Sequence, residues 1–272
     1  MTEKDVVVRF GLLADPHYAR REMQINRYYR DALEKARRAV KVFNESPLDF
    51  IIELGDLKDM TENPRREEML SFLDEIEAEL QKYNGPVYHV LGNHDMDSIS
   101  KTDFLSRTKN PDAVKARAYY SFELKKIKFI VLDANYNPDG SDYDRGNFTW
   151  TSSFIPADQL VWLEKELQCG RPCIVFVHQL LDSFSPVDKD YFVHNADEIR
   201  SILEKSGQVP AVFQGHYHRG SYGFCRGIHY YTLASMADNP LPANSFAIVE
   251  IHRDLGIKIQ GFGTAESRYL AP

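Results

Sequence analysis

The sequence predicts a mixed α/β fold in which two packed β-sheets are flanked by helices. Two observations support this prediction. Short apolar runs alternate with amphipathic segments over the first part of the chain, and strand-like runs dominate the last part. No Pro/Gly/Ser-rich linker, repeat or low-complexity tract divides the sequence, so we expect residues 1–272 to form a single domain.

Hydrophobic patterning predicts the individual elements in chain order. Strands are expected over 6–14, 50–55, 86–92, 128–134, 173–178, 211–216, 228–234, 245–252 and 257–262. Helices are expected over 27–45, 65–83, 156–168 and about 196–205. The first strand, VVVRFGLLA, has the Val and Leu content of a buried strand. The first helix carries apolar residues at helical spacing, namely Ala32, Ala36, Ala39, Val40 and Phe43.

The charge and the apolar content of the chain argue against two classes of partner, nucleic acids and membranes. The net charge of −7 argues against broad nucleic-acid binding, which needs a positive surface. The N-terminal stretch MTEKDVVVRF lacks the apolar region of a signal peptide, and no apolar run approaches the ~18 residues of a membrane span. The three cysteines, Cys169, Cys173 and Cys225, suit a reducing compartment and are expected to be packing residues. We therefore expect a cytoplasmic protein with no membrane or nucleic-acid partner.

Polar side chains recur where the predicted strands end. Five of the nine histidines and three other polar residues lie at or just beyond a strand: Asp15, His17, Asp56, Asn93, His94, His178, His216 and His218. Ligands bind outside the carboxyl ends of strands in open α/β sheets, so these side chains are expected to converge on one crevice. The other histidines, His89, His194, His229 and His252, have no such placement and are assigned structural or surface roles.

The mixture of donors indicates a metal site. Carboxylate oxygens, an amide oxygen and several imidazoles suit Mn, Fe or Zn, whereas Ca and Mg prefer oxygen ligands alone. The donors are too many for one ion and suit two ions that share a carboxylate, for which Asp56 is the candidate. Two ions ~3.5–4 Å apart form the clamp used for displacement at phosphorus.

The same motifs resemble the calcineurin-like metallophosphoesterases. The chain carries DPH at 15–17, GD at 55–56, GNHD at 92–95, a single His178 and GHYH at 215–218, in the order of that family. The resemblance implies a four-layer αββα sandwich with a dinuclear metal centre. It implies two ligand sets that share Asp56: Asp15, His17, Asp56 and His218 for one metal, and Asp56, Asn93, His178 and His216 for the other.

Two further residues of the GNHD block are assigned catalytic roles. His94 is expected just outside the metal ligands, where it can stabilise or protonate the leaving oxygen. Asp95 has two interpretations of equal weight. It either fixes the tautomer of His94, as a carboxylate behind a histidine does, or caps the N-terminus of a helix.

A closer resemblance, over nearly the whole chain, is to the manganese-dependent ADP-ribose/CDP-alcohol diphosphatases. It is carried by RYYRDAL (27–33), YYSFELKKIKFIVLDANY (119–136), QLVWLEKEL (159–167) and GIHYYTLASMAD (227–238). It implies a phosphohydrolase that cleaves a phosphoester or phosphoanhydride of a small nucleotide-type substrate, such as ADP-ribose or a CDP-alcohol, by attack of a metal-bound hydroxide. Manganese is the expected metal, with iron or zinc as alternatives. The animal members have Gln where this chain has His17.

Candidate substrate contacts come from two sources. Loops 135–155 and 179–195 carry aromatic residues that either stack a base or anchor the loops: Tyr136, Tyr143, Phe148, Trp150, Phe154, Phe184, Tyr191 and Phe192. Of these, Tyr136 and Phe148 are our candidates for substrate binding. Arg27 and Arg30 are candidates for a distal phosphate, and a solvated helix face is the alternative for them. A phosphodiesterase or phosphatase of another small substrate, such as a cyclic nucleotide, and a non-catalytic metal-binding scaffold remain alternative functions.

Overall fold

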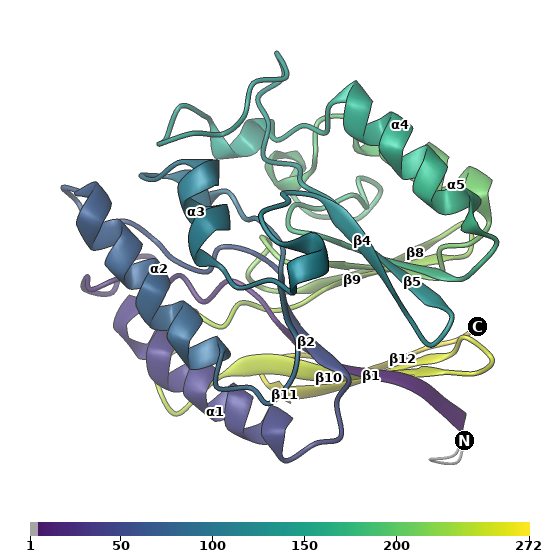
Figure 1. The fold of residues 1–272 in the computed structure, drawn as a ribbon, viewed down its shortest axis with the longest axis horizontal. Coiled ribbons are helices and arrows are strands. Elements are labelled where there is room, and N and C mark those ends of the chain that lie inside the picture. Colours follow the sequence, from purple (N-terminus) through teal and green to yellow (C-terminus); the bar gives the residue numbers. More distant parts are fainter. Residues whose placement is uncertain (1–4) are drawn as a thin grey trace.

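The computed structural model describes residues 5–272 and has two six-stranded mixed β-sheets (Figure 1). The first sheet has the order β12-β11-β10-β1-β2-β3 and the second β4-β5-β6-β7-β9-β8. The strands are β1 (Val6–Leu13), β2 (Phe50–Glu53), β3 (Val87–His89), β4 (Tyr120–Leu124), β5 (Ile127–Val131), β6 (Cys173–Val177), β7 (Ala211–Gln214), β8 (Ser221–Cys225), β9 (Ile228–Thr232), β10 (Ser245–His252), β11 (Ile257–Gly263) and β12 (Arg268–Leu270). The helices are α1 (Ala32–Asn44), α2 (Arg66–Leu80), α3 (Lys101–Arg107), α4 (Ala157–Glu166) and α5 (Ala196–Ser206).

The two sheets pack face to face between two layers of helices. Figure 1 shows α1 and α2 against the outer face of the first sheet, and α4 and α5 against the outer face of the second. The predicted αββα fold class is therefore confirmed. No helix within residues 5–272 has the length and apolar content that crossing a membrane requires.

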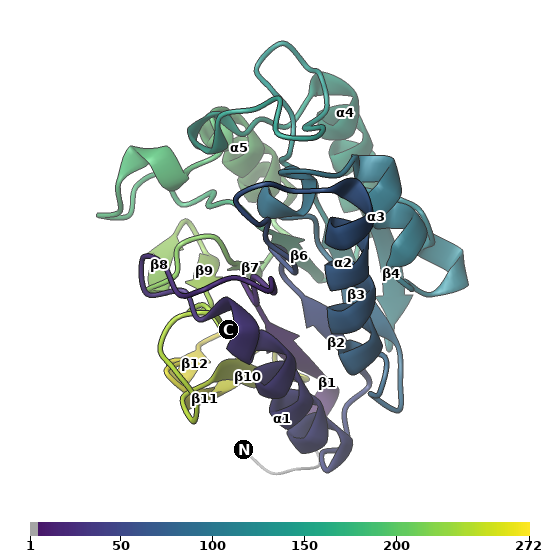
Figure 2. The same cartoon turned by 90° about the vertical axis from the view of Figure 1, so that its left-hand side faces the viewer.

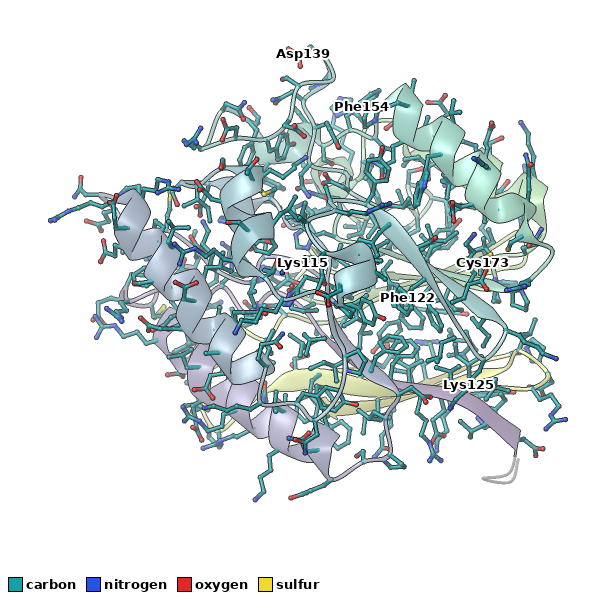
Figure 3. All side chains as sticks on the ribbon, in the orientation of Figure 1. Lys115, Phe122, Lys125, Asp139, Phe154 and Cys173 are labelled. Carbon is teal, nitrogen blue, oxygen red and sulfur yellow. The ribbon has the colours of Figure 1, made fainter. Side chains whose placement is uncertain are left out.

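Aromatic side chains fill the space between the sheets. The rings of Tyr88 in β3 and Phe122 in β4 stack with their centroids 4.0 Å apart, and those of Phe50 in β2 and Phe129 in β5 lie 5.1 Å apart. Figure 3 shows Phe122 in this layer, while Asp139 marks the far tip of the loop after β5. Such contacts give a large apolar burial with defined ring geometry, so they hold the sheets together without hydrogen bonds.

All nine predicted strands and all four predicted helices are present, and the first helix buries the apolar positions assigned to it. That helix begins later than predicted, since residues 29–31 form a 3₁₀ turn before α1. The prediction missed β4, β8, β12 and α3. The hairpin between β4 and β5 turns on Lys125 and Lys126, with φ of 50° and 70°. This turn lacks the Asn-Gly signal on which recognition of such hairpins depends.

The parallel strands end at one edge of the molecule. β1 pairs in parallel with β2, and β2 with β3, while β5, β6, β7 and β9 form the parallel part of the second sheet. Figure 2, which shows the left-hand side of Figure 1, places the purple segment after β1 and the green segment after β6 near this edge. The predicted site residues therefore come from both sheets.

Candidate metal centre and active site

Four candidate ligands have a backbone conformation that residues other than glycine rarely adopt. Asp15, His17, Asp56 and His216 have φ values of 54°, 49°, 58° and 65°. A left-handed conformation costs of order 1 kcal/mol or more at each such residue, and this strain gathers at functional sites. Each of these residues lies just after a strand. Its left-handed conformation turns the chain at the point where its side chain approaches the other candidate ligands.

The turns after β2 and β3 approach each other very closely. A Cβ atom on Gly92 would lie 2.1 Å from the backbone nitrogen of Asp56 and 2.3 Å from its Oδ1 atom. Only glycine fits at that position. The backbone N–H of His94 donates to Asp56 Oδ1 at 2.7 Å. The GD and GNHD motifs therefore interlock, and this contact places Asp56 beside Asn93.

The first group of candidate ligands is Asp15, His17 and His218, whose ligand atoms lie within 4.8 Å of one another. The Nε2 atoms of His17 and His218 are 3.0 Å apart, and His218 Nε2 is 3.7 Å from Asp15 Oδ1. Asp56 completes the group, because its Oδ2 atom lies 3.5 Å from His17 Nε2. Asp15, His17 and Asp56 are fully or almost fully buried.

The second group is Asp56, His178 and His216. His178 Nε2 lies 3.2 Å from Asp56 Oδ2 and 3.2 Å from His216 Nδ1. The Oδ1 atom of Asn93 is buried and has no hydrogen-bond partner among the described residues. Two ring nitrogens that face each other beside an unpaired amide oxygen and a carboxylate fit a divalent cation. Because Asp56 belongs to both groups, the arrangement fits two ions with one shared carboxylate.

The outer ring nitrogens of three of these histidines have partners that orient them. His178 donates from Nδ1 to the carbonyl oxygen of Leu54 at 2.7 Å. His17 Nδ1 lies 3.1 Å from Asp59 Oδ2, and His218 Nδ1 lies 2.8 Å from Asp238 Oδ1. Such contacts keep the proton on Nδ1 and leave Nε2 free to bind a metal.

Asp59 and Asp238 were not among the predicted site residues. Asp59 lies in the GDLKD segment, three residues after Asp56, and Asp238 is the last residue of the stretch GIHYYTLASMAD. Their spacing in the sequence did not predict that either aspartate contacts a histidine of the site. Their roles become visible only when the strands of both sheets are in place.

His94 lies beside the first ligand group, with its ring centroid 4.8 Å from that of His17 and its side chain 26% exposed. Its Nδ1 atom is 3.5 Å from Asp59 Oδ1 and 3.6 Å from Asp97 Oδ2, and its Nε2 atom is 3.3 Å from Arg27. Burial opposes a charge on this ring, but Asp59 and Asp56 outweigh it and hold the pKa of His94 well above its usual value. His94 also forms a possible ligand group with His17 and Asp56. An acid and a ligand are therefore the two roles to be distinguished.

Neither predicted role of Asp95 agrees with the structure. Its carboxylate accepts backbone N–H groups from Gly92 at 2.8 Å, Leu57 at 2.9 Å and Asp56 at 3.1 Å. The carboxylates beside His94 are those of Asp59 and Asp97 instead. Asp95 therefore fastens the turn after β2 to the turn after β3, which explains why a buried carboxylate is needed there.

A cavity of about 480 Å³ opens beside both ligand groups. It is lined by Ile25, Asn26, Arg27, Asp56, Asn93, His94, Trp150, Tyr191, His216, Tyr217, His218, Arg219 and Asp238. The Trp150 and Tyr191 rings are 5.4 Å apart, and Tyr191 lies 5.5 Å from the His216 ring. The cavity therefore has an aromatic wall beside the second ligand group and Arg27 beside His94.

Of the four predicted substrate contacts, only Arg27 lines this cavity. Arg30 lies on an exposed face and pairs with Glu22 at 2.8 Å. The Tyr136 ring lies 3.8 Å from the ammonium group of Lys101. Phe148 stacks on Tyr143, with centroids 4.0 Å apart, so it anchors its loop. Trp150 and Tyr191, two of the aromatic residues singled out in the sequence, take the position predicted for Tyr136 and Phe148.

An αββα sandwich with two adjoining groups of metal ligands at its strand ends defines a dinuclear metallohydrolase. Residues 8–220 match the family of calcineurin-like phosphoesterases, and the chain belongs to this family. It is therefore a metal-dependent phosphohydrolase.

Within this family, the chain is similar to several individual proteins. The chain is 26% identical to a manganese-dependent ADP-ribose/CDP-alcohol diphosphatase of Arabidopsis thaliana, over 89% of this chain and 90% of the plant protein. It is 25% identical to the protein of the same name from Oryza sativa, over 93% and 91% of the two chains. A dimetal phosphatase from Danio rerio has the same fold, with a TM-score of 0.84 and 22% identity over 98% of this chain and 99% of that one.

Proposed function

We propose that this protein hydrolyses the diphosphate bond of a nucleotide-type small molecule, such as ADP-ribose or a CDP-alcohol, with two manganese ions. The observation that carries the proposal is the composition of the cavity. It joins two ligand groups that share Asp56 to an arginine beside His94 and to an aromatic wall beside His216. Similarity to diphosphatases named for these substrates supports it. We take residues 1–272 to act as a single domain.

The ligand groups would hold the ions as the sequence predicts. Asp15, His17, Asp56 and His218 would bind one, and Asp56, Asn93, His178 and His216 would bind the other. When bound, the two ions supply positive charge for the phosphoryl oxygens and an activated water as the nucleophile. Three of the ligand histidines, His17, His178 and His216, are buried, and Asp56 is shared, so the two sites have a fixed position relative to each other.

The other residues of the cavity act on the substrate. His94, held by Asp59 and Asp97, would donate its proton to the oxygen that leaves. Arg27 lies 3.3 Å from His94 Nε2, so its guanidinium would contact the second phosphate, to which that oxygen is attached. Trp150 and Tyr191 would stack the base, a contact of roughly 1–3 kcal/mol for each ring.

The proposal is tested by hydrolysis of five substrates: ADP-ribose, CDP-choline, cyclic AMP, bis-p-nitrophenyl phosphate and p-nitrophenyl phosphate. Each is tested with Mn, Zn, Mg and Fe. We expect kcat/KM to be highest with Mn and with ADP-ribose or CDP-choline, each giving two monophosphate products. A preference for cyclic AMP would make the protein a cyclic-nucleotide phosphodiesterase and overturn the proposed substrate. No hydrolysis of any substrate, with no stoichiometric metal bound, would indicate a scaffold.

A further inference from the structure

We propose that Asn135 is a positioning residue that fixes Asn93 relative to His178, and so controls the affinity of one metal site without touching either metal. The inference rests on the ligand set proposed above. Asn135 lies after the end of β5 and is fully buried. The sequence analysis did not assign Asn135 to the site, although it directly follows the predicted strand 128–134.

The side chain of Asn135 joins two segments that carry ligands from different sheets. Its Nδ2 atom donates to the carbonyl oxygen of Leu91 at 2.7 Å, two residues before Asn93. Its Oδ1 atom accepts a hydrogen bond from Gln179 Nε2 at 2.7 Å, and Gln179 directly follows His178. Asn93 follows β3 of the first sheet, whereas His178 follows β6 of the second.

Asn135 is itself held rigidly. Asp133 Oδ1 accepts hydrogen bonds from both the backbone nitrogen and the Nδ2 atom of Asn135, each at 2.9 Å. Lys101 donates to Asp133 Oδ2 at 2.7 Å and to the carbonyl oxygen of Asn135 at 3.1 Å. A buried ion pair therefore locks the amide plane, and the amide can act as a spacer of fixed length between its two partners.

The spacer matters because metal sites tolerate little error in distance. Ligand atoms need to lie within about 0.2 Å of their ideal positions. Apolar contacts between the sheets are not directional and allow small shifts, whereas hydrogen bonds through Asn135 do not. The ring of His178 is also fixed to the first sheet through Leu54. Asn135 adds the link to the turn that carries Asn93, so it controls the site that uses both residues.

The test compares Asn135→Ala with Asn195→Ala, a matched control. Asn195 also joins two segments, since it donates from Nδ2 to the carbonyl oxygen of Ile155 at 2.9 Å and accepts from the Ile155 nitrogen at 3.1 Å. It holds no strand that ends in a candidate ligand. Binding of Mn is measured by calorimetry and by electron paramagnetic resonance of the manganese pair, and the melting temperature of each metal-free protein is recorded.

For Asn135→Ala we expect one of the two Mn-binding steps to weaken by about 10–100-fold, while the other stays as in the wild type. The spin-coupled signal of the manganese pair should appear only at higher Mn concentration, and excess Mn should restore kcat. Asn195→Ala should keep both binding steps, and the melting temperatures show whether a change in Mn binding accompanies a general loss of stability. Equal binding in the two variants, or equal weakening of both steps in Asn135→Ala, would overturn the inference.

A second variant covers the case in which Asn135→Ala does not fold. Gln179 contributes one hydrogen bond to the link, and its Oε1 atom has no partner within residues 5–272, so Gln179→Met removes that bond alone. We expect the same selective weakening, and unchanged Mn binding in this variant would contradict the inference. If the wild type itself binds fewer than two Mn ions, the proposed ligand set fails, which is a separate result.

Discussion

The carboxylate of Asp59 lies 3.5 Å from His94 Nδ1 through one oxygen and 3.1 Å from His17 Nδ1 through the other. One buried side chain therefore orients both a candidate metal ligand and the candidate acid. Asp97 contacts His94 but not His17, and its Oδ2 atom lies 3.6 Å from His94 Nδ1. This difference makes the two aspartates a matched pair for experiment.

Asp59→Asn should lower metal affinity by about 10–100-fold and also lower kcat, because the orientation of His17 and the charge beside His94 both depend on this carboxylate. Asp97→Asn should lower kcat and leave metal affinity unchanged. Metal titration and steady-state rates at saturating Mn separate the two effects. If the two variants lose metal affinity equally, Asp59 has no special relationship to His17.

Asp56→Asn should abolish activity and leave at most one tightly held metal ion. The Oδ2 atom of Asp56 lies 3.5 Å from His17 Nε2 and 3.2 Å from His178 Nε2, so its carboxylate takes part in both ligand groups. A neutral amide cannot offset the charge of two cations. The number of bound ions is measured by elemental analysis after gel filtration, and circular dichroism checks the fold. Two bound ions together with more than a tenth of the wild-type rate would rule out a bridging role.

Arg27→Met and Arg30→Met should have different outcomes although the two residues are only three positions apart in the chain. Arg27 lines the cavity beside His94, whereas Arg30 is exposed and paired with Glu22. Arg27→Met should lower kcat/KM on a diphosphate substrate at least tenfold, since a charge-assisted hydrogen bond is worth about 1.5–3 kcal/mol. Arg30→Met should behave as the wild type. Equal effects of the two substitutions would place the distal phosphate elsewhere.

The sequence predicted those features of the fold and of the candidate site whose pattern lies within one short stretch of the chain. The candidate ligands were identified because each lies just beyond an apolar strand and carries a side chain that can bind a metal. The first helix was found because its apolar residues repeat at 3.6-residue spacing. Whether Arg27 or Arg30 faces the cavity depends on the direction of the chain just before α1, where a 3₁₀ turn lies. Hydrophobic patterning does not predict this direction.

The supporting residues were missed for a different reason. Asp59, Asp238 and Asn135 act on residues far away in the sequence or on the other sheet, so no spacing reveals them. One of the two interpretations of Asp95, a contact with His94, followed from their being neighbours in the chain, and the other was a helix cap. The carboxylate of Asp95 points instead to the backbone N–H groups around Asp56, a contact that exists only after β2 and β3 pair.

A buried histidine outside the catalytic cavity should make stability depend on pH. His89 Nε2 lies 3.0 Å from Glu77, and Nδ1 lies 3.6 Å from Glu53. Burial opposes a charge on His89, but Glu77 and Glu53 outweigh it and raise its pKa to about 10. The folded state then holds a proton that the unfolded state releases above pH ~6.5, so this contribution is complete below that pH and is lost as pH rises to about 10.

His89→Gln should therefore be about 3–5 kcal/mol less stable than the wild type near pH 7, because removing one partner leaves a buried charge uncompensated. The difference should shrink by up to ~1.4 kcal/mol for each pH unit between pH 7.5 and 10. Lys35 titrates in this range with the opposite sign, since burial lowers its pKa to about 8, but it is common to both proteins. Urea unfolding at several pH values measures the difference, and a constant gap would mean that His89 is neutral.

His94 separates metal binding from chemistry. As an acid, it acts only on the charge that develops on the leaving oxygen, so His94→Ala should keep both metal ions. The rate should fall by roughly 10²–10⁴, the usual contribution of a positioned general acid. As a ligand, which its contacts with His17 and Asp56 also allow, it should lose metal occupancy together with the rate.

The two roles of His94 also differ in their response to the leaving group. A phosphate monoester leaving from ADP-ribose needs a proton, whereas p-nitrophenolate leaves as a stable anion and needs little help. His94→Ala should therefore lose much more rate on ADP-ribose than on bis-p-nitrophenyl phosphate. Metal content is measured on the same samples. Equal losses on both substrates, with two metal ions still bound, would show that His94 positions the phosphate and does not protonate the leaving oxygen.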